Sequence, residues 1–188
     1  MTRPKGKNPE PAAAIGRRPR PTTPHTKYTM IDFEPHYRRV EQLIYAWARA
    51  IDEDRVEHIA ELLLDDGRYT VKSRFNHDRG LPLAVIDAQS AAQLRDRILS
   101  MRKANVYQPQ HYRHMLSGVH IASGDDNTFE VTHNFLIVRT MDLSGDMKIF
   151  ATGQCHDLIV LTPEGAKFKE RLFLFDSRVV ETLMVIPL

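Results

Sequence analysis

Apolar side chains recur at helical spacing in the first part of the chain that can form a core. The members of this stripe are separated by three or four positions, and they are Tyr37, Val40, Ile44, Trp47 and Ile51. Such spacing puts them on one face of an amphipathic helix. The pattern predicts a helix over residues 34–51, with a proline at position 35 suited to its first turn.

Two more helices are indicated further along. Asp54, with Glu57 three residues on, is typical of a helix start, and the apolar side of this second helix is Val56, Ile59, Leu62 and Leu63. A third helix is expected after Asp87, with Ala91, Leu94, Ile98 and Met101 on its buried face. Between these helices, Gly67 indicates a turn into a short strand, and "NHDRGLPL" (76–83) indicates a loop.

From Tyr107 onward the period changes from helical to alternating. Turn clusters at 123–127, 143–147 and 162–166 separate stretches rich in Val, Ile, Phe and Thr. They predict four strands in an antiparallel meander, over 112–122, 128–142, 147–161 and 167–184. The last strand is long enough that we expect a bend near Asp176 and Ser177.

The order of these elements predicts the fold class. Helices that precede a meander must cover one face of its sheet, which gives an α+β architecture. We expect a curved antiparallel sheet wrapped on the long first helix, forming a cone with an interior pocket.

Charge and composition divide the chain near residue 30. Residues 1–30 hold seven Lys or Arg, one acidic residue and six of the eleven prolines, while residues 31–188 hold 19 basic and 23 acidic residues and carry a net charge of −4. A basic, proline-rich segment with few apolar residues cannot bury enough surface to order itself. We therefore expect a disordered tail over 1–30 and a single cone domain over 31–188. A start at Met30 is the alternative, and no basic face accompanies the tail to suggest nucleic-acid binding.

Compartment follows from two further features. No apolar run approaches the ~18 residues of a membrane span, which predicts a protein without a membrane segment. Cys155 is the single cysteine, so no internal disulfide forms, which fits the reducing cytoplasm.

"QHYRHMLSG" (110–118) raises the question of a metal site, because His111 and His114 stand three apart. They share a face only on a helix, and Pro109 together with the β-rich residues that follow favours a strand. A Rieske cluster needs two cysteines as well as two histidines. Glu130 and His133 likewise lack the second histidine that a mononuclear iron site requires. A hydrogen-bonded role in the pocket or at an interface for His114 is the simpler interpretation.

Acid–base and nucleophilic chemistry have limited support. Asp176 is placed on one strand face with Leu172 and Leu174, and a carboxylate inside an apolar cone can have a raised pKa. Its simpler interpretation is an acceptor, or an ion pair with an arginine at a strand bend. Cys155 is expected to be a buried, inert thiol. The chain contains no G-x-S-x-G, P-loop or G-x-G-x-x-G motif.

Three segments together resemble a known family. They are "NHDRGLPL", "DRILSMRKANVYQPQHYRHMLSG" and the terminal "FKERLFLFDSRVVETLMVIPL". Residues 31–188 resemble the small (β) subunits of aromatic-ring-hydroxylating dioxygenases, most of all those that serve terephthalate, and more distantly those of salicylate hydroxylase and anthranilate dioxygenase. The tail lies outside the resemblance.

The resemblance implies a specific role. The family has the cone fold of nuclear transport factor 2 and ketosteroid isomerase, and its small subunit carries no metal. A large (α) subunit holds the Rieske 2Fe–2S cluster and the mononuclear Fe(II), and NADH supplies electrons through a reductase. The small subunit supports assembly, typically as an α3β3 hexamer that also brings small subunits together. The residues expected to have structural or subunit-interface roles are Tyr112, Arg113, His114, Arg171 and Asp176, the last two as an interior pair or a contact fixing the bend.

Two other functions stay open at this stage. A stand-alone isomerase or dehydratase would use Asp176 and His114 on a small ligand in the cone. A binding protein would hold a ligand there without turnover. Fold alone does not choose between them.

Overall fold

The structure is a computed structural model that describes residues 34–125, 127–180 and 184–188, and residues 31–188 form one compact unit. The tail predicted to be disordered, residues 1–30, lies outside the described residues. In chain order the elements are α1 (Glu34–Asp52), the 3-10 helix η1 (Val56–Leu62), β1 (Leu63–Ser73), α2 (Arg74–Asp78), β2 (Ile86–Ala88), α3 (Ala91–Ala104), β3 (Gln110–Gly124), β4 (Thr128–Met141), β5 (Met147–Thr162) and β6 (Gly165–Phe175). No helix in the described part of the chain is both long and apolar enough to cross a bilayer.

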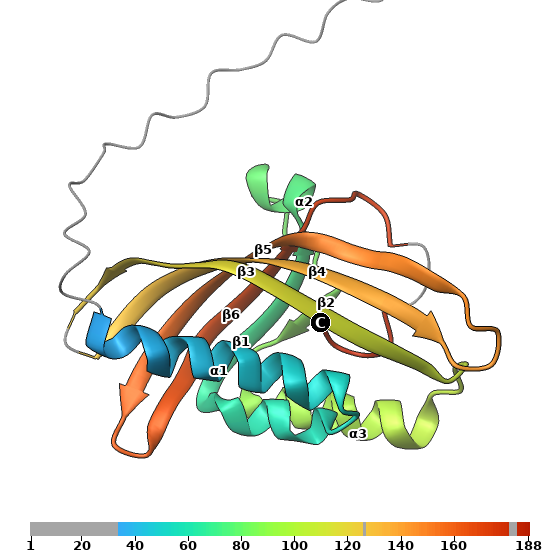
Figure 1. The fold of residues 1–188 in the computed structure, drawn as a ribbon, viewed down its shortest axis with the longest axis horizontal. Helices are drawn as coiled ribbons and strands as arrows, with labels where there is room; N and C mark the ends of the chain where they lie inside the picture. The colour runs from blue at the N-terminus through green and yellow to red at the C-terminus, as the bar shows by residue number, and fades with distance from the viewer. Residues whose placement is uncertain (1–33, 126, 181–183) are drawn as a thin grey trace, which may run out of the picture. The chain divides into compact units, whose positions relative to one another are not determined.

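The predicted meander and fold class are confirmed, with one correction. The six strands form a single sheet in the order β2-β1-β6-β5-β4-β3, and β3 to β6 pair antiparallel as expected. However, β1 pairs with β6 in parallel, so the curved sheet is mixed and not purely antiparallel. Figure 1 shows the sheet arching over α1 and α3, which lie on its concave side, while α2 projects from the opposite side.

The apolar stripe of α1 packs under the sheet as its spacing predicts. Val40, Ile44 and Trp47 have no exposed surface, and Ile51 is 5% exposed. Tyr37, one turn earlier, is the exception at 38% exposed. Its hydroxyl donates to the carbonyl oxygen of Val119 in β3, at 3.5 Å. The stripe therefore buries only from the second turn, where the sheet begins to cover the helix.

The second helix differs in type and in its start. The segment is a 3-10 helix whose N-cap is Arg55, with no side-chain cap, and Asp54 has a positive φ of 54°. The carboxylates of Asp54 and Glu57 both contact Arg102 of α3, at 2.7 Å each. The expected capping by Asp54 is wrong because its carboxylate is used to hold α3.

Side-chain caps mark the two later helices. In α2, which occupies part of the expected loop 76–83, the hydroxyl of Ser73 accepts from the backbone N–H of Asn76 at 3.2 Å. In α3 the cap is Ser90, three residues after the predicted Asp87, and its hydroxyl accepts from the N–H of Gln93 at 3.2 Å. The buried face of α3 consists of the four residues predicted, Ala91, Leu94, Ile98 and Met101.

The end of the described chain packs inside the cone. β6 stops at Phe175 instead of continuing to 184, and the segment 184–188 returns beneath the sheet, where Figure 1 marks the C-terminus. Leu188 has no exposed surface, and its carbonyl oxygen accepts from the indole N–H of Trp47 (2.8 Å) and the hydroxyl of Tyr69 (3.0 Å). Much of the interior expected to be a pocket is therefore occupied by the chain itself.

Candidate functional site

Three ionisable side chains lie together inside the cone, one from each of β4, β5 and β6. Nη1 of Arg171 donates to Oδ2 of Asp157 at 2.9 Å, and Nε2 of His133 lies 3.4 Å from the same oxygen. The side chains of His133 and Asp157 are 0% exposed and that of Arg171 is 1% exposed. We call this group the buried triad.

Aromatic rings surround the cation of the buried triad. The guanidinium carbon of Arg171 lies 4.2 Å from the ring centre of Phe168 and 4.8 Å from those of Trp47 and Phe173. A guanidinium over aromatic faces gains electrostatic attraction, most of all where water is excluded. The cation is therefore paired with the carboxylate of Asp157 through Nη1 and packed against three aromatic rings, while its buried Nε has no hydrogen-bond partner among the described residues.

Asp176 is not part of this group, and the expected pairing with Arg171 is wrong. On β6, Arg171, Phe173 and Phe175 are buried in the interior, so the alternating positions, including the one that follows Phe175, face outward. The carboxylate of Asp176, with 47% of its side chain exposed, instead pairs with Arg74 of α2 at 2.7 Å and accepts from the hydroxyl of Thr152 at 3.2 Å. It is an ion pair at the end of a strand, on the outer face of the sheet.

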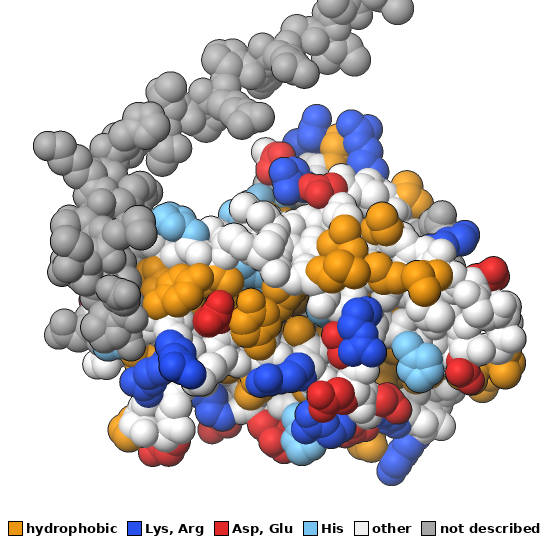
Figure 2. All heavy atoms as spheres, in the orientation of Figure 1, with side chains coloured by type: hydrophobic (Ala, Val, Ile, Leu, Met, Phe, Trp, Pro, Cys, Tyr) orange, Lys and Arg blue, Asp and Glu red, His pale blue; other side chains and the backbone are white. Residues whose placement is uncertain are grey.

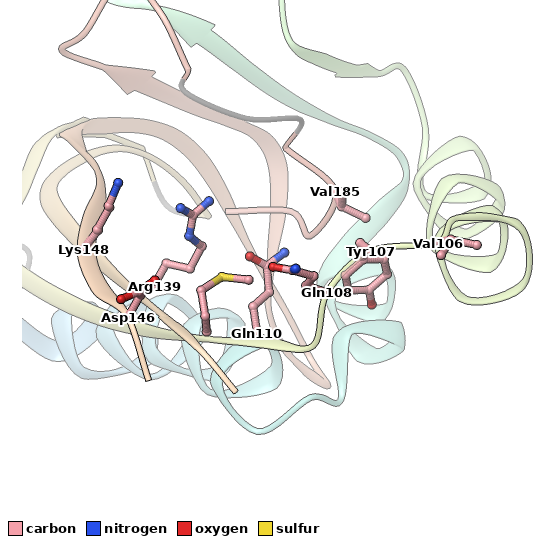
Figure 3. A pocket seen from close by; sticks show the side chains of 9 residues that line it. Val106, Tyr107, Gln108, Gln110, Arg139, Asp146, Lys148 and Val185 are labelled. Carbon is pink, nitrogen blue, oxygen red and sulfur yellow. The ribbon is translucent and has the colours of Figure 1, made fainter. Parts of the chain in front are cut away.

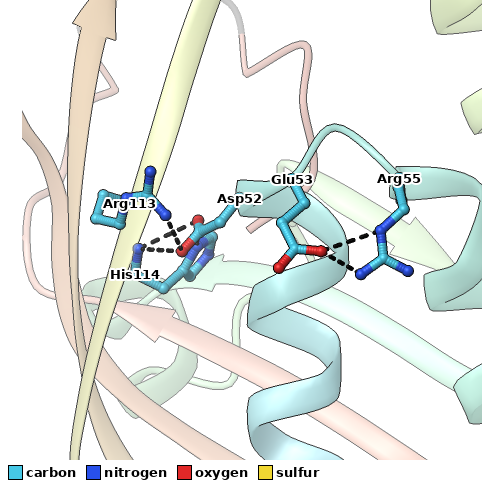
Figure 4. A network of polar contacts seen from close by, with 5 residues as sticks. All are labelled: Asp52, Glu53, Arg55, Arg113 and His114. Carbon is cyan, nitrogen blue, oxygen red and sulfur yellow. Dashed lines mark hydrogen bonds and ion pairs between the residues drawn. The ribbon is translucent and has the colours of Figure 1, made fainter.

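His111 and His114 point to opposite sides of β3, as the strand interpretation requires. The side chain of His111 is 64% exposed, whereas that of His114 is 1% exposed. Nδ1 of His114 lies 2.6 Å from Oδ1 of Asp52, and its backbone N–H donates to Oδ2 of the same carboxylate at 3.0 Å. Figure 4 shows Asp52 reaching from the end of α1 to β3.

Asp52 also provides a hydrogen-bond acceptor at the free edge of the sheet. β3 is the last strand of the sheet, so N–H groups on its free side have no strand partner. The carboxylate of Asp52 accepts one of them, at His114. An acid in the last turn of a helix opposes the helix dipole. That unfavourable position was the signal in the sequence for Asp52, and sequence reasoning missed it.

Tyr112 and Arg113 have different surroundings. Tyr112 is 3% exposed, its ring centre lies 5.1 Å from that of Phe150, and burial raises the pKa of its hydroxyl. Arg113 points outward with 68% of its side chain exposed, and its nearest carboxylate contact is Asp52 at 4.0 Å. Thus Tyr112 belongs to the core, whereas Arg113 is available at the surface.

A hollow of about 360 Å³ lies at one end of the cone (Figure 3). Its wall combines amide, basic, acidic and apolar side chains, namely Val106, Tyr107, Gln108, Gln110, Arg139, Met141, Asp146, Lys148 and Val185. A neighbouring hollow of about 300 Å³ shares Arg139 and Lys148. None of the five residues singled out from the sequence lines either hollow.

Cys155 is a core residue. It is 0% exposed on the interior face of β5, and burial raises the pKa of its thiol well above the usual value. Among residues 34–125, 127–180 and 184–188, no three His, Cys, Asp or Glu side chains gather in an arrangement that could hold a metal ion.

The chain is similar in sequence to proteins of known function. The SnoaL-like domain family matches residues 35–172. The small subunit of anthranilate 1,2-dioxygenase from Burkholderia cepacia is 33% identical over 138 residues, covering 73% of this chain and 85% of that subunit. A β subunit of the terminal oxygenase component of terephthalate 1,2-dioxygenase from Comamonas sp. is 35% identical over 143 residues, covering 76% of this chain and 92% of that subunit. The chain belongs to the small-subunit family of aromatic-ring-hydroxylating dioxygenases.

A solved structure agrees with membership of the small-subunit family. A Novosphingobium aromaticivorans protein, assigned as the β subunit of an aromatic-ring-hydroxylating dioxygenase, superposes with a TM-score of 0.75 at 27% identity, over 82% of this chain and 97% of that one. The stand-alone enzyme that was the alternative needed Asp176 and His114 in one pocket. In this member of the family they are apart, since His114 is buried against α1 and Asp176 pairs with Arg74 on the outer face.

Proposed function

We propose that the chain is the non-metal small subunit of a multicomponent dioxygenase that hydroxylates an aromatic carboxylate such as terephthalate. Its role is to support the assembly and stability of the catalytic large subunit. One observation carries the proposal: the similarity runs along 85–92% of the length of relatives that are themselves small subunits of anthranilate and terephthalate dioxygenases.

The interior of the cone supports a scaffold role over a catalytic one. Every member of the buried triad is at most 1% exposed, and the segment 184–188 packs beneath the sheet. A substrate would have to displace packed core residues to reach Asp157 or His133. The buried ion pair joins β5 to β6 and makes the domain rigid, as expected of a subunit that supports the folding and assembly of another.

The redox chemistry is proposed to reside on the partner. A Rieske cluster takes two cysteine and two histidine ligands, whereas this chain has one cysteine, buried and with a raised thiol pKa. The Rieske 2Fe–2S cluster and the mononuclear Fe(II) are assigned to the large (α) subunit, and NADH would supply electrons through a reductase. The expected assembly is an α3β3 hexamer, in which small subunits also meet one another.

The residues named from the sequence receive separate roles in this proposal. Arg171 and Tyr112 stabilise the interior, His114 joins β3 to α1 through Asp52, and Asp176 fixes the end of β6. Arg113, beside Asp52, has the most exposed side chain of the five and is the one proposed to contact a neighbouring subunit.

Co-expression tests the proposal directly. The chain is produced with a Rieske large subunit that acts on an aromatic carboxylate, and the complex is sized and assayed for dihydrodiol formation. We expect one complex containing both chains, and no stoichiometric iron on the isolated small subunit. Stoichiometric iron on the isolated chain, or ring hydroxylation by it with only a reductase added, would overturn the proposal. His114→Ala should reduce recovery of the complex, and unchanged assembly and activity would remove its role.

A further inference from the structure

The segment "NHDRGLPL" projects from the outer face with exposed apolar, basic and acidic side chains, the acid being Asp78. The proposed assembly role has not yet given this segment a function. The projecting surface comprises α2 and the loop that follows it, residues 74–85, together with Arg178, which lies over the ring of Phe75. We call this surface the outer knob. Figure 2 shows it at the top of the molecule, where basic side chains flank an apolar one and acidic side chains lie below them.

Two arginines enclose the aromatic ring of the outer knob. The guanidinium carbon of Arg79 lies 3.8 Å from the ring centre of Phe75, and that of Arg178 lies 4.1 Å from it. In the described part of the chain neither arginine pairs with a carboxylate. Stacking fixes the planes of the two guanidinium groups. Nη1 of Arg79 also donates to the backbone carbonyl oxygen of Phe75 at 3.4 Å, and the remaining N–H groups can donate to an acidic group.

The loop of the outer knob is fixed while it exposes apolar side chains. Leu81, Leu83 and Val85 are 41%, 71% and 42% exposed, at alternate positions of an extended segment. The amide of Asn76 donates to the carbonyl oxygen of Leu83 at 3.1 Å, and the N–H of Val85 donates to that of Val71 at 2.8 Å. Single exposed apolar residues are common on protein surfaces, but three held together by an ordered loop beside stacked arginines form a typical binding surface.

The charges of the described hollows argue against a second copy of this chain as the partner of the outer knob. A second copy would have to offer a hollow with acidic walls, but hollows of 360, 300 and 230 Å³ in the described part are lined by more basic than acidic side chains. Two of them share Arg139 and Lys148. The third contains Arg68 and Lys72 against the single acid Glu170. In the third hollow, like charges would therefore meet in a contact with the knob of another copy.

We infer that the outer knob docks onto the large subunit, into an apolar depression edged by carboxylates. The inference rests on the proposed function, which supplies a partner chain of a different sequence. Leu83 would enter the depression, and Arg79 and Arg178 would donate to carboxylates at its rim. Buried arginine and aromatic groups are the residues that most often dominate the binding energy of interfaces.

Binding of the purified large subunit to the full-length small subunit tests the inference. The variants are Leu83→Asp and the double variant Arg79→Glu/Arg178→Glu, with Leu83→Ser as a milder change. Leu99 on α3, 51% exposed, provides the matched control Leu99→Asp. We expect the knob variants to bind at least about tenfold more weakly, which is typical of hot-spot residues. The control should bind like the wild type, and circular dichroism should show all variants folded.

Ionic strength provides a second readout. Wild-type binding should weaken as salt rises, because exposed charges are screened, and the double arginine variant should lose this dependence. If the wild type forms a complex and the knob variants bind equally well, the inference is wrong while the proposed function stands. If the wild type does not bind the large subunit at all, both fail. If Leu83→Asp changes only the oligomeric state of the isolated small subunit, the partner is a second copy and the inference is also wrong.

Discussion

The buried triad permits a quantitative prediction about the stability of the small subunit. Asp157→Asn keeps the shape of the side chain but leaves Arg171, 1% exposed, without a counter-charge. Breaking a buried ion pair from one side costs about 3–5 kcal/mol. The three aromatic rings around the guanidinium each offer roughly 0.5–2 kcal/mol of attraction. We therefore expect a loss near the lower end of that range, about 3 kcal/mol.

Arg171→Met removes the other partner and should cost more. The carboxylate of Asp157 would stay buried without the guanidinium, with Nε2 of His133 at 3.4 Å. We expect a loss of about 4–5 kcal/mol, a large part of the roughly 5–15 kcal/mol that stabilises a typical domain. The combined variant Asp157→Leu/Arg171→Met buries no charge, so its stability should lie within about 2 kcal/mol of the wild type.

Urea unfolding followed by the fluorescence of Trp47, the only tryptophan, measures all three variants. Asp66 forms an exposed ion pair with Lys169, and the variant Asp66→Asn serves as the control. This variant should leave the urea midpoint unchanged. Two results would refute the reasoning. One is a loss below about 1 kcal/mol in each single variant, and the other is a combined loss equal to the sum of the single ones.

Three further predictions follow from individual contacts. Tyr69→Phe removes the hydroxyl that accepts from the buried N–H of Leu188 at 2.9 Å, so urea unfolding should show a loss of about 1–3 kcal/mol, and an unchanged midpoint would contradict the role of this contact. The Arg102 guanidinium holds the pKa of Glu57 in the folded protein below its usual value. The pair therefore stabilises the fold at pH values above the pKa of Glu57 in the unfolded chain. This stabilisation is lost as the pH falls through the lower pKa of the folded state. Glu57→Gln should thus cost at most about 1 kcal/mol near neutral pH and nothing in strong acid, and a pH-independent difference in melting temperature would argue against it. Gly153→Ala would place a methyl group 1.9 Å from the carbonyl oxygen of Leu174, so we expect a loss of at least about 1–3 kcal/mol by thermal unfolding, with the smaller Ala151→Gly change on the same strand for comparison.

The features predicted correctly from the sequence were mostly those that depend on residues close together in the chain. The buried faces of α1 and α3 follow from spacings of three and four residues, and the strands of the meander follow from alternation between turn clusters. The element boundaries were less well predicted. Ser90 caps α3 in place of Asp87, because helix starts depend on which side chain the backbone N–H groups finally meet.

The buried triad had a signal in the sequence that was not used. Asp157 alternates with Cys155 and Ile159 on β5, and Arg171 alternates with Phe173 on β6, so each charge is in phase with apolar side chains. Such a phase predicts a buried charge on each strand. It does not say that Asp157 stands directly opposite Arg171, because the register between two strands is set by their pairing along their full length.

By itself, then, the sequence determined the buried faces of α1 and α3, the meander, the lone cysteine and the family motifs, because these depend on neighbours in the chain or on composition. The tertiary structure decided the parallel pairing of β1 with β6, the outward position of Asp176 and the link from Asp52 to His114. It also decided that segment 184–188 packs inside the cone. These features join residues that are tens of positions apart. Their contacts become favourable only when the whole sheet has curved over α1 and excluded water from the core.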